Sequence, residues 1–258
     1  MESADFHHHL ALLDWQVELG ATEAISDTPV DRFDVPAVLE KPKAVAAAAP
    51  FRQAVQATKE DVVAIAERAA KAAESFNELR TTLAAFEHCD LKKGARNLVF
   101  SDGIAGARVM LIGESPDREE DVAGKPFVGR TGQLLDKMLE AIQLGRDREE
   151  APVYITNVLP WRPPQNRDPK PEDLAMMKPF LMRHIELAAP EVIVILGNSP
   201  CQALLGKRGI TRLRGQWTQV AGRPALPMFH PSQLLKSPAL KREAWADFLS
   251  LKARLRDG

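Results

Sequence analysis

Four short apolar runs in the second half of the chain constrain its fold more than any other feature. They are RVMLI, VYIT, VIVIL and ALPMF, at residues 108–112, 153–156, 192–196 and 225–229. Helical patterns of apolar residues separate the first three, at residues 132–144 and 171–190. Continuous apolar strands that alternate with helices are typical of a parallel sheet covered on both faces. We therefore predict a doubly wound α/β fold, with three α/β/α layers around a central, mostly parallel four-stranded sheet.

The chain has 258 residues, enough for one catalytic-sized domain and a smaller appendage. Its hydrophobic content of 45% and charged content of 27% are those of a soluble globular protein. No apolar run approaches the roughly 20 residues that span a membrane, and the N-terminus lacks the layout of a signal peptide. We expect a cytoplasmic protein without a membrane segment, and we take it to be a monomer.

The character of the sequence changes near residue 56. Residues 1–56 combine a short amphipathic helix, predicted at 6–20, with a linker rich in Ala and Pro, whereas residues 57–258 form the predicted catalytic domain. Good helix formers from Thr58 onward predict one long helix packed on this domain. Residues 1–56 hold nine acidic and four basic side chains, and residues 202–258 hold three acidic and eleven basic. The basic end suits a phosphate backbone but equally suits a solvated helix.

Each predicted strand runs into a polar loop. The loops are GESPD, NVLPWRPP, GNSPC and HPSQLL, and they supply Glu114, Asn157 and His230, while the run GKPFVG supplies Phe127. In an open parallel sheet, loops at the carboxyl ends of the strands converge on the ligand site. Each of these side chains also has a structural interpretation, as a loop brace, a strand cap, a turn histidine or a core residue. The residues taken singly leave both interpretations open.

The second loop begins the segment NVLPWRPPQNRDP, residues 157–169, which contains four prolines. Prolines at this density cannot supply the donors of a helix or a central strand, so we expect a stiff, extended loop. Its arginines either bind a ligand or are solvated, and Trp161 is either a ligand contact or a buried anchor.

Several chemistries are disfavoured. No Walker A or GxGxxG pattern is present, which argues against nucleotide cofactors. A Ser–His–carboxylate triad with Ser115 or Ser199 is disfavoured because neither serine lies in GxSxG and a proline follows each. The two cysteines, Cys89 and Cys201, form no CxxC pair and so exclude a disulfide framework and a cysteine-rich metal site. Three adjacent histidines, at 7–9, cannot all face one ion from a helix.

Taken together, the motifs resemble the family 4 uracil-DNA glycosylases of the uracil-DNA glycosylase superfamily. The likeness covers residues 86–254 and is carried, in order, by GESPDREEDVAGKPFVGRTGQLLDKMLEAIQL, YITNVLPWRPPQNRDPKPED, PEVIVILGNSPCQALLG, ITRLRGQW and HPSQLL. It implies a DNA-repair enzyme that flips uracil out of DNA and hydrolyses its N-glycosidic bond, leaving an abasic site.

The resemblance also implies roles for the side chains that follow the strands. Phe127 would stack on uracil, Asn157 would hydrogen-bond its O4 and N3 edge, and His230 would stabilise the charge that grows on O2. Glu114 would orient the attacking water or stabilise the sugar cation. The other residues expected at the substrate are Gly113, Ser115, Pro116 and Asp121.

Contacts to single- or double-stranded uracil-containing DNA are expected from the second and fourth loops. Leu234 or Leu235 would be the wedge that fills the vacated base stack. The candidates for phosphate contacts are Arg162, Asn166, Arg167, Ser232 and Lys236.

The chain departs from the family pattern where iron would bind. Family 4 members carry an iron–sulfur cluster on four cysteines, whereas the matching positions here are Phe86, Cys89, Trp161 and Met177. One thiol cannot hold a cluster that needs four ligands. We therefore expect no cofactor and no metal, with an apolar plug in place of the cluster.

Two smaller departures bear on catalysis. Ser115 and Asp117 replace residues that are usually small in the family, and whether they take part in water activation stays open. They motivate an alternative function, a weakly catalytic or non-catalytic protein that binds uracil or abasic sites in DNA. The first hypothesis is a monofunctional uracil-DNA glycosylase that needs no metal.

Overall fold

The computed structural model describes residues 9–13, 15–17 and 59–257. Residues 9–13 and 15–17 are helical, within the helix predicted at 6–20. The predicted linker, Thr58 and the boundary near residue 56 lie outside the described residues. Two compact units are distinguished, Met1–Gln53 and Ala54–Gly258, and all described strands belong to the second.

The second unit is built on a six-stranded sheet with the order β1-β3-β2-β4-β6-β5. The four central strands are parallel, and they are β2 (Val109–Gly113), β3 (Val153–Asn157), β4 (Val192–Leu196) and β6 (Arg223–Met228). They are the four predicted strands. Two antiparallel edge strands, β1 (Asp102–Gly103) and β5 (Thr218–Val220), were not predicted. They are too short to show an apolar pattern, so only their pairing defines them.

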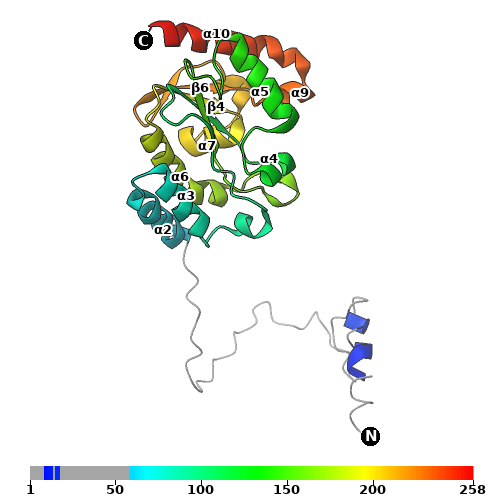
Figure 1. Cartoon of the computed structure of the whole chain (residues 1–258). Coiled ribbons are helices and arrows are strands. Elements are labelled where there is room, and N and C mark those ends of the chain that lie inside the picture. The colour runs from blue at the N-terminus through cyan, green and yellow to red at the C-terminus, as the bar shows by residue number, and fades with distance from the viewer. Residues whose placement is uncertain (1–8, 14, 18–58, 258) are drawn as a thin grey trace, which may run out of the picture. The chain divides into compact units, whose positions relative to one another are not determined.

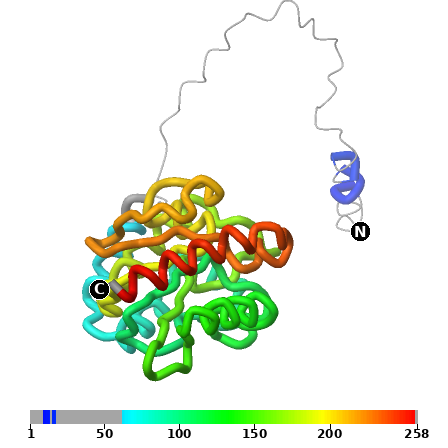
Figure 2. Tube along the Cα trace, turned by 90° about the horizontal axis from the view of Figure 1, so that it is seen from above, coloured from blue at the N-terminus to red at the C-terminus, as the bar shows by residue number. Residues whose placement is uncertain are grey.

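Helices cover both faces of this sheet, which confirms the three-layer α/β/α arrangement. One face carries α5 (Gly129–Ala141) and α10 (Lys241–Asp257), whereas the other carries α2 (Lys59–Ala72), α3 (Phe76–Ala85), α6 (Pro171–Ala188) and α7 (Asn198–Leu205). Figures 1 and 2 show α10, in red, on the first of these faces. The shorter helices are α4 (Arg118–Ala123), α8 (Ile210–Leu213) and α9 (Pro231–Lys236). No described helix is long and apolar enough to cross a membrane.

Alternation along the strands divides the core into two clusters. On β2, Val109 and Leu111 pack with α5, whereas Met110 and Ile112 belong to the cluster under α3 and α6. All five residues of β2 are buried, because both faces of a doubly wound sheet are covered. The same alternation decides which side chains at the strand ends share a pocket.

The long helix predicted from Thr58 is wrong, because two helices are present in its place. The α2 helix ends at Ala72 and α3 begins at Phe76, with Ser75 as its N-cap. The Ser75 hydroxyl accepts a hydrogen bond from the Glu78 N–H at 3.2 Å, and the Glu78 carboxylate accepts one from the Glu74 N–H at 2.7 Å. The pattern Ser-x-x-Glu in SFNE is a helix-start signal that the run of helix formers concealed.

This cap predicts the cost of removing it. We expect Ser75→Ala to lower the free energy of unfolding by about 1 kcal/mol, because the Glu78 N–H loses its acceptor. Denaturant unfolding followed by circular dichroism measures the change. Ser237→Ala is the matched control, since Ser237 is an exposed cap residue without a side-chain cap hydrogen bond. Equal stability of both variants and the parent would contradict the cap.

Candidate active site

The loops predicted to converge do follow the carboxyl ends of neighbouring parallel strands. Gly113, the last residue of β2, pairs with Asn157, the last residue of β3. Beyond the strands the pairing continues, since Val158 donates its N–H to the Gly113 carbonyl at 2.9 Å. The β4 strand lies beside β2, and β6 lies beside β4, so the loops that follow them leave the same end of the sheet. The site therefore lies at the carboxyl end of the parallel strands, where ligands bind in open α/β sheets.

Gly113 leaves the space that the pocket residues occupy. A Cβ at this position would lie 2.4 Å from Asn157 Oδ1 and 2.6 Å from Phe127 Cε2. The Asn157 amide and the Phe127 ring therefore lie against the same backbone atom. Both side chains are buried, and Asn157 Nδ2 is the one buried side-chain nitrogen or oxygen among the described residues without a hydrogen-bond partner. An orphaned buried donor is costly, so it points to a ligand that accepts from it.

His230 lies beside Phe127, with ring centroids 5.3 Å apart and an interplanar angle of 33°. Its Nδ1 accepts a hydrogen bond from the Ser232 N–H at 3.3 Å, and the Ser232 hydroxyl lies 2.8 Å from the same nitrogen. Because a backbone N–H can only donate, the proton of the neutral ring is on Nε2. Burial lowers the pKa of His230, although the charges of Glu114 and Asp117 oppose this shift. The ring is thus a neutral donor.

The Glu114 carboxylate is held at the N-terminus of α7. Its Oε1 accepts hydrogen bonds from the N–H groups of Asn198 at 2.8 Å and Ser199 at 3.2 Å. A negative charge is favourable at a helix N-terminus. Gly197, with φ of 101°, permits this approach, because a Cβ there would lie 2.6 Å from Oε1.

The segment that carries Phe127 is held by a buried carboxylate. Glu120 accepts hydrogen bonds from the N–H groups of Phe127 and Asp117. Burial raises the pKa of Glu120 to about 7, against the effect of these N–H donors and of Arg146. Asp117 is the N-cap of α4 and accepts from the N–H groups of Glu119 and Glu120. Its carboxylate therefore caps the first turn of α4.

Two residues predicted for the site have other positions. The Asp121 carboxylate is buried and accepts from the N–H groups of Arg96 and Asn97, at 2.8 and 3.2 Å, so it braces a loop. Leu234 is fully buried and cannot be an exposed wedge, which corrects that assignment. Its neighbour Leu235 is partly exposed and remains the candidate. Ser115 is partly exposed and Pro116 is buried, both between Glu114 and the start of α4.

The proline-rich segment is only partly extended. Residues Pro164–Asn166 form a 3-10 turn, with φ of 55° at Gln165 and 53° at Asn166. Arg162 donates to the Asn166 side chain at 2.8 Å, and Arg167 forms an ion pair with Asp173 at 3.0 Å. The prolines indicated an extended loop, so this turn was not predicted. Asparagine nevertheless tolerates the left-handed conformation that the turn requires. Lys236, at the end of α9, is exposed.

The four positions that match cluster ligands do not fit an iron–sulfur cluster. Phe86, Cys89, Trp161 and Met177 are buried in one apolar cluster, so Trp161 faces the interior. The Phe86 ring packs against that of Phe180 at 5.2 Å. Burial raises the pKa of Cys89, which disfavours the thiolate that metals require. Cys89 carries the one thiol among these four residues.

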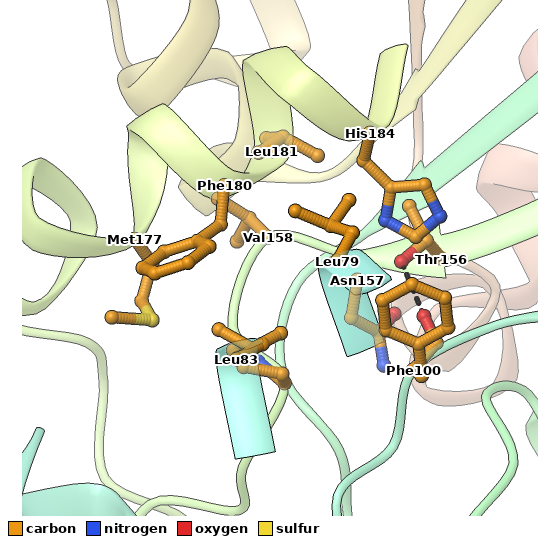
Figure 3. Close-up of a pocket in the computed structure, with 11 residues that line it drawn as sticks. Leu79, Leu83, Phe100, Thr156, Asn157, Val158, Met177, Phe180, Leu181 and His184 are labelled. Carbon is orange, nitrogen blue, oxygen red and sulfur yellow. Dashed lines mark hydrogen bonds between the residues drawn. The ribbon is translucent and has the colours of Figure 1, made fainter. Parts of the chain in front are cut away.

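A cavity lined by Met177 and Phe180 lies in this part of the core. Figure 3 shows both side chains on α6, with Leu83 and Val158 nearby. The cavity measures about 20 Å³, which is room for about one water molecule. Packed apolar side chains therefore occupy this region. Among the described residues, no group of three His, Cys, Asp or Glu side chains is placed to hold a metal ion.

Sequence reasoning missed three groups that support the site. The N–H groups of Asn198 and Ser199, which hold Glu114, follow from where α7 begins. Glu120 could have been found, because Asp117-x-x-Glu120 is a capping-box pattern. No local pattern in the sequence indicates a role for Arg146, because it lies in a loop 19 residues beyond Phe127 and contacts it only in the folded chain.

The raised pKa of Glu120 predicts a pH-dependent stability. A group whose pKa is higher in the folded state stabilises the protein below its unfolded value, here 4.5, and this contribution is lost as the pH rises through 7. Because of this group, we expect the free energy of unfolding to fall by roughly 3 kcal/mol as the pH rises from below 4.5 to above 7. Comparing the pH profiles of the parent and Glu120→Gln by denaturant unfolding isolates the effect. Glu140→Gln, at an exposed position on α5, is the control, and parallel profiles for all three proteins would refute the shift.

Comparison with known proteins agrees with this geometry. Residues 100–249 match the uracil DNA glycosylase superfamily. The type-4 uracil-DNA glycosylase of Archaeoglobus fulgidus is 38% identical over 184 residues, which cover 68% of this chain and 90% of that protein. That of Thermotoga maritima is 42% identical over 154 residues, or 58% and 77% of the two chains. A type-5 enzyme from Pyrobaculum aerophilum is 31% identical over 146 residues, or 51% and 64%. On this evidence, the chain belongs to the uracil DNA glycosylase superfamily.

Proposed function

We propose that this protein is a monofunctional uracil-DNA glycosylase, which flips uracil out of DNA and hydrolyses the N-glycosidic bond to leave an abasic site. The observation that carries this proposal is the buried Nδ2 of Asn157, which has no partner, on an amide whose Oδ1 lies against Gly113 together with the ring of Phe127. An aromatic face next to an unpaired amide suits a planar base with hydrogen-bonding edges.

Base selection follows from the two ends of the Asn157 amide. Its Nδ2 would donate to O4 of uracil, and its Oδ1 would accept from N3–H. Cytosine carries a donor where uracil carries O4, so the buried Nδ2 would face another donor. A site that leaves buried polar groups unpaired rejects the wrong base strongly. Phe127 would stack on the base and fix its plane.

His230 would stabilise the departing uracil anion. Its Nδ1 accepts from the Ser232 N–H, so the proton on Nε2 is available for O2 of the base. Negative charge grows on O2 as the glycosidic bond breaks, and a hydrogen bond aimed at it strengthens in the transition state. A neutral donor suits this role, because it needs no proton uptake at neutral pH.

Glu114 would act on the sugar side of the bond. Its Oε1 accepts both N–H groups at the start of α7, which fixes the carboxylate. Negative charge at this position would stabilise the oxocarbenium-like sugar, and Oε2 would orient the attacking water. The next residue, Ser115, remains a candidate for holding that water.

The remaining proposals concern the DNA contacts, the oligomeric state, the cellular location and the cofactor. Uracil-containing DNA would be held, as a single or double strand, by phosphate contacts from Arg162, Asn166, Arg167, Ser232 and Lys236. We propose that the protein acts as a monomer in the cytoplasm. We also propose that it works without an iron–sulfur cluster, because Phe86, Trp161 and Met177 fill that region with packed side chains.

A binding protein without efficient catalysis is the second candidate. It is favoured by Asp117, whose carboxylate caps α4 and is thereby engaged away from a water-activating role. Tight binding of uracil-containing DNA, without alkali-labile sites after incubation, would identify this function.

The deciding experiment is uracil release in the presence of EDTA. We expect the purified protein to release uracil from single- or double-stranded oligonucleotides and to leave alkali-labile sites, since no step needs a metal. Release is measured by strand cleavage after alkali, with the matching thymine oligonucleotide as the control. Absence of release from both substrates would overturn the proposed activity.

Substitutions at the pocket test the individual roles. We expect His230→Ala and Asn157→Ala each to lower the single-turnover rate by about 100- to 1000-fold, because each removes a hydrogen bond to the developing anion. His88→Ala and Asn77→Ala, both at exposed positions, are the matched controls. Thermal unfolding separates loss of function from loss of fold, and a change in the rate below threefold for the pocket variants would contradict these roles.

Iron analysis tests the absence of the cluster. We expect protein purified anaerobically to contain less than about 0.1 iron per chain and no visible absorption band, since the site offers one thiol where a cluster takes four. Colorimetric iron determination and an absorption spectrum measure this. Near-stoichiometric iron with sulfide would refute the packed site.

A further inference from the structure

Phe127 has a backbone conformation that its residue type disfavours. Its φ is 52°, in the left-handed region that is rare for residues other than Gly, Asn and Asp. A bulky residue keeps such a conformation only where the surrounding structure determines it, and these positions cluster at functional sites. The contacts that hold the Phe127 backbone therefore also hold its ring.

Both polar groups of the Phe127 backbone are bonded to ionic side chains, one buried and one partly buried. The N–H donates to the Glu120 carboxylate, and the carbonyl accepts from Arg146 Nη2 at 3.0 Å. Arg146 Nη1 also donates to the preceding carbonyl, that of Pro126, at 3.2 Å. The carbonyl is confined further by α5, because a Cβ at Gly132 would lie 1.7 Å from it.

Arg146 is itself fixed from two sides. Its Nη1 donates to Asp102 on β1 at 2.8 Å, and its Nε donates to Asp136 on α5 at 2.8 Å. The Arg146 and Asp102 side chains are 12% and 18% exposed, so this pair is only weakly screened by water. One guanidinium thus joins the edge strand, α5 and the Phe127 segment. A lysine could not do this, because its ammonium is a point charge without the planar fork of donors.

We propose that Arg146 is a positioning residue for base recognition, which acts by holding the carbonyl side of the strained Phe127 backbone while Glu120 holds its N–H side. This inference rests on the proposed function, because Phe127 matters for catalysis only if it stacks on the base. Arg146 does not touch the substrate in this arrangement. It sets the plane of the Phe127 ring against Asn157 and His230.

A double-mutant cycle tests whether Arg146 acts through Phe127. We expect Arg146→Ala to lower the single-turnover rate of uracil release roughly 10- to 100-fold, because a small misplacement of a positioning group is costly. In a Phe127→Ala background, the same change should lower the rate less than threefold, since the group that Arg146 holds is absent. Affinity for undamaged DNA of the same length should be unchanged in Arg146→Ala.

Arg183→Ala is the matched control for loss of a structural arginine. Arg183 is also partly buried and bonds a backbone carbonyl, that of Ala73 at 2.8 Å, together with Glu186 at 2.8 Å, on the far face of the sheet. We expect it to lower thermal stability without changing the single-turnover rate. Equal fold losses for Arg146→Ala in the parent and Phe127→Ala backgrounds would overturn the proposal, because they would show an effect that does not pass through the ring.

Hydrogen exchange separates failure of this inference from failure of the proposed function. Peptides that span residues 124–130 should exchange faster in Arg146→Ala than in the parent, and should be unchanged in Arg183→Ala, whether or not uracil is released. Unchanged exchange in this segment would refute the positioning role on its own. If Arg146→Ala does not fold, Arg146→Lys and Asp102→Asn replace it, with the same expected direction in both measurements.

Discussion

The site depends on the register that places Gly113 of β2 directly beside Asn157 of β3. Only a residue without a Cβ leaves room there for both the Asn157 amide and the Phe127 ring. Because side chains alternate along a strand, this register also sends Asn157 to the face of the sheet that carries Phe127. A shift of one residue would turn the amide toward the α3 and α6 side, where the core is apolar. The two-faced burial of the parallel strands prevents that shift.

Buried and partly buried carboxylates around the pocket accept hydrogen bonds from backbone N–H groups. Glu114 accepts from the N–H groups at the start of α7, Glu120 from that of Phe127, and Asp121 from those of Arg96 and Asn97. Loops that leave the end of a sheet carry N–H and carbonyl groups that no ladder satisfies. Carboxylates and Arg146 satisfy them, so the loops are held in fixed positions. Asn157 Nδ2 stands apart, because it is buried without a partner and is therefore left for a ligand.

Apolar packing fills the core on the α3 and α6 side of the sheet. Relatives named type-4 uracil-DNA glycosylases match this chain over most of the second unit, yet Phe86, Trp161 and Met177 are buried in its apolar core. Large apolar side chains stabilise such a region by the area they remove from water, whereas a cluster stabilises it through four bonds. The buried Trp161 side chain anchors the loop after β3 in this core.

The sequence by itself determined the four central strands, their parallel direction, the helices α5 and α6 between the first three of them, and the loops that carry Glu114, Phe127, Asn157 and His230. These follow from local patterns, because apolar periodicity and strand-end loops are written in consecutive residues. Tertiary structure alone decided the rest. The break at Ser75 is the exception, because its Ser-x-x-Glu cap is a local signal that the longer run of helix formers concealed. The edge strands β1 and β5 are defined only by their pairing, which for β1 joins residues far apart along the chain. The burial of Leu234, the brace made by Asp121 and the contact between Arg146 and Phe127 join residues that no local pattern connects. Which polar side chains face a ligand, and which bond the backbone, is fixed only when the strands pair and bring them together.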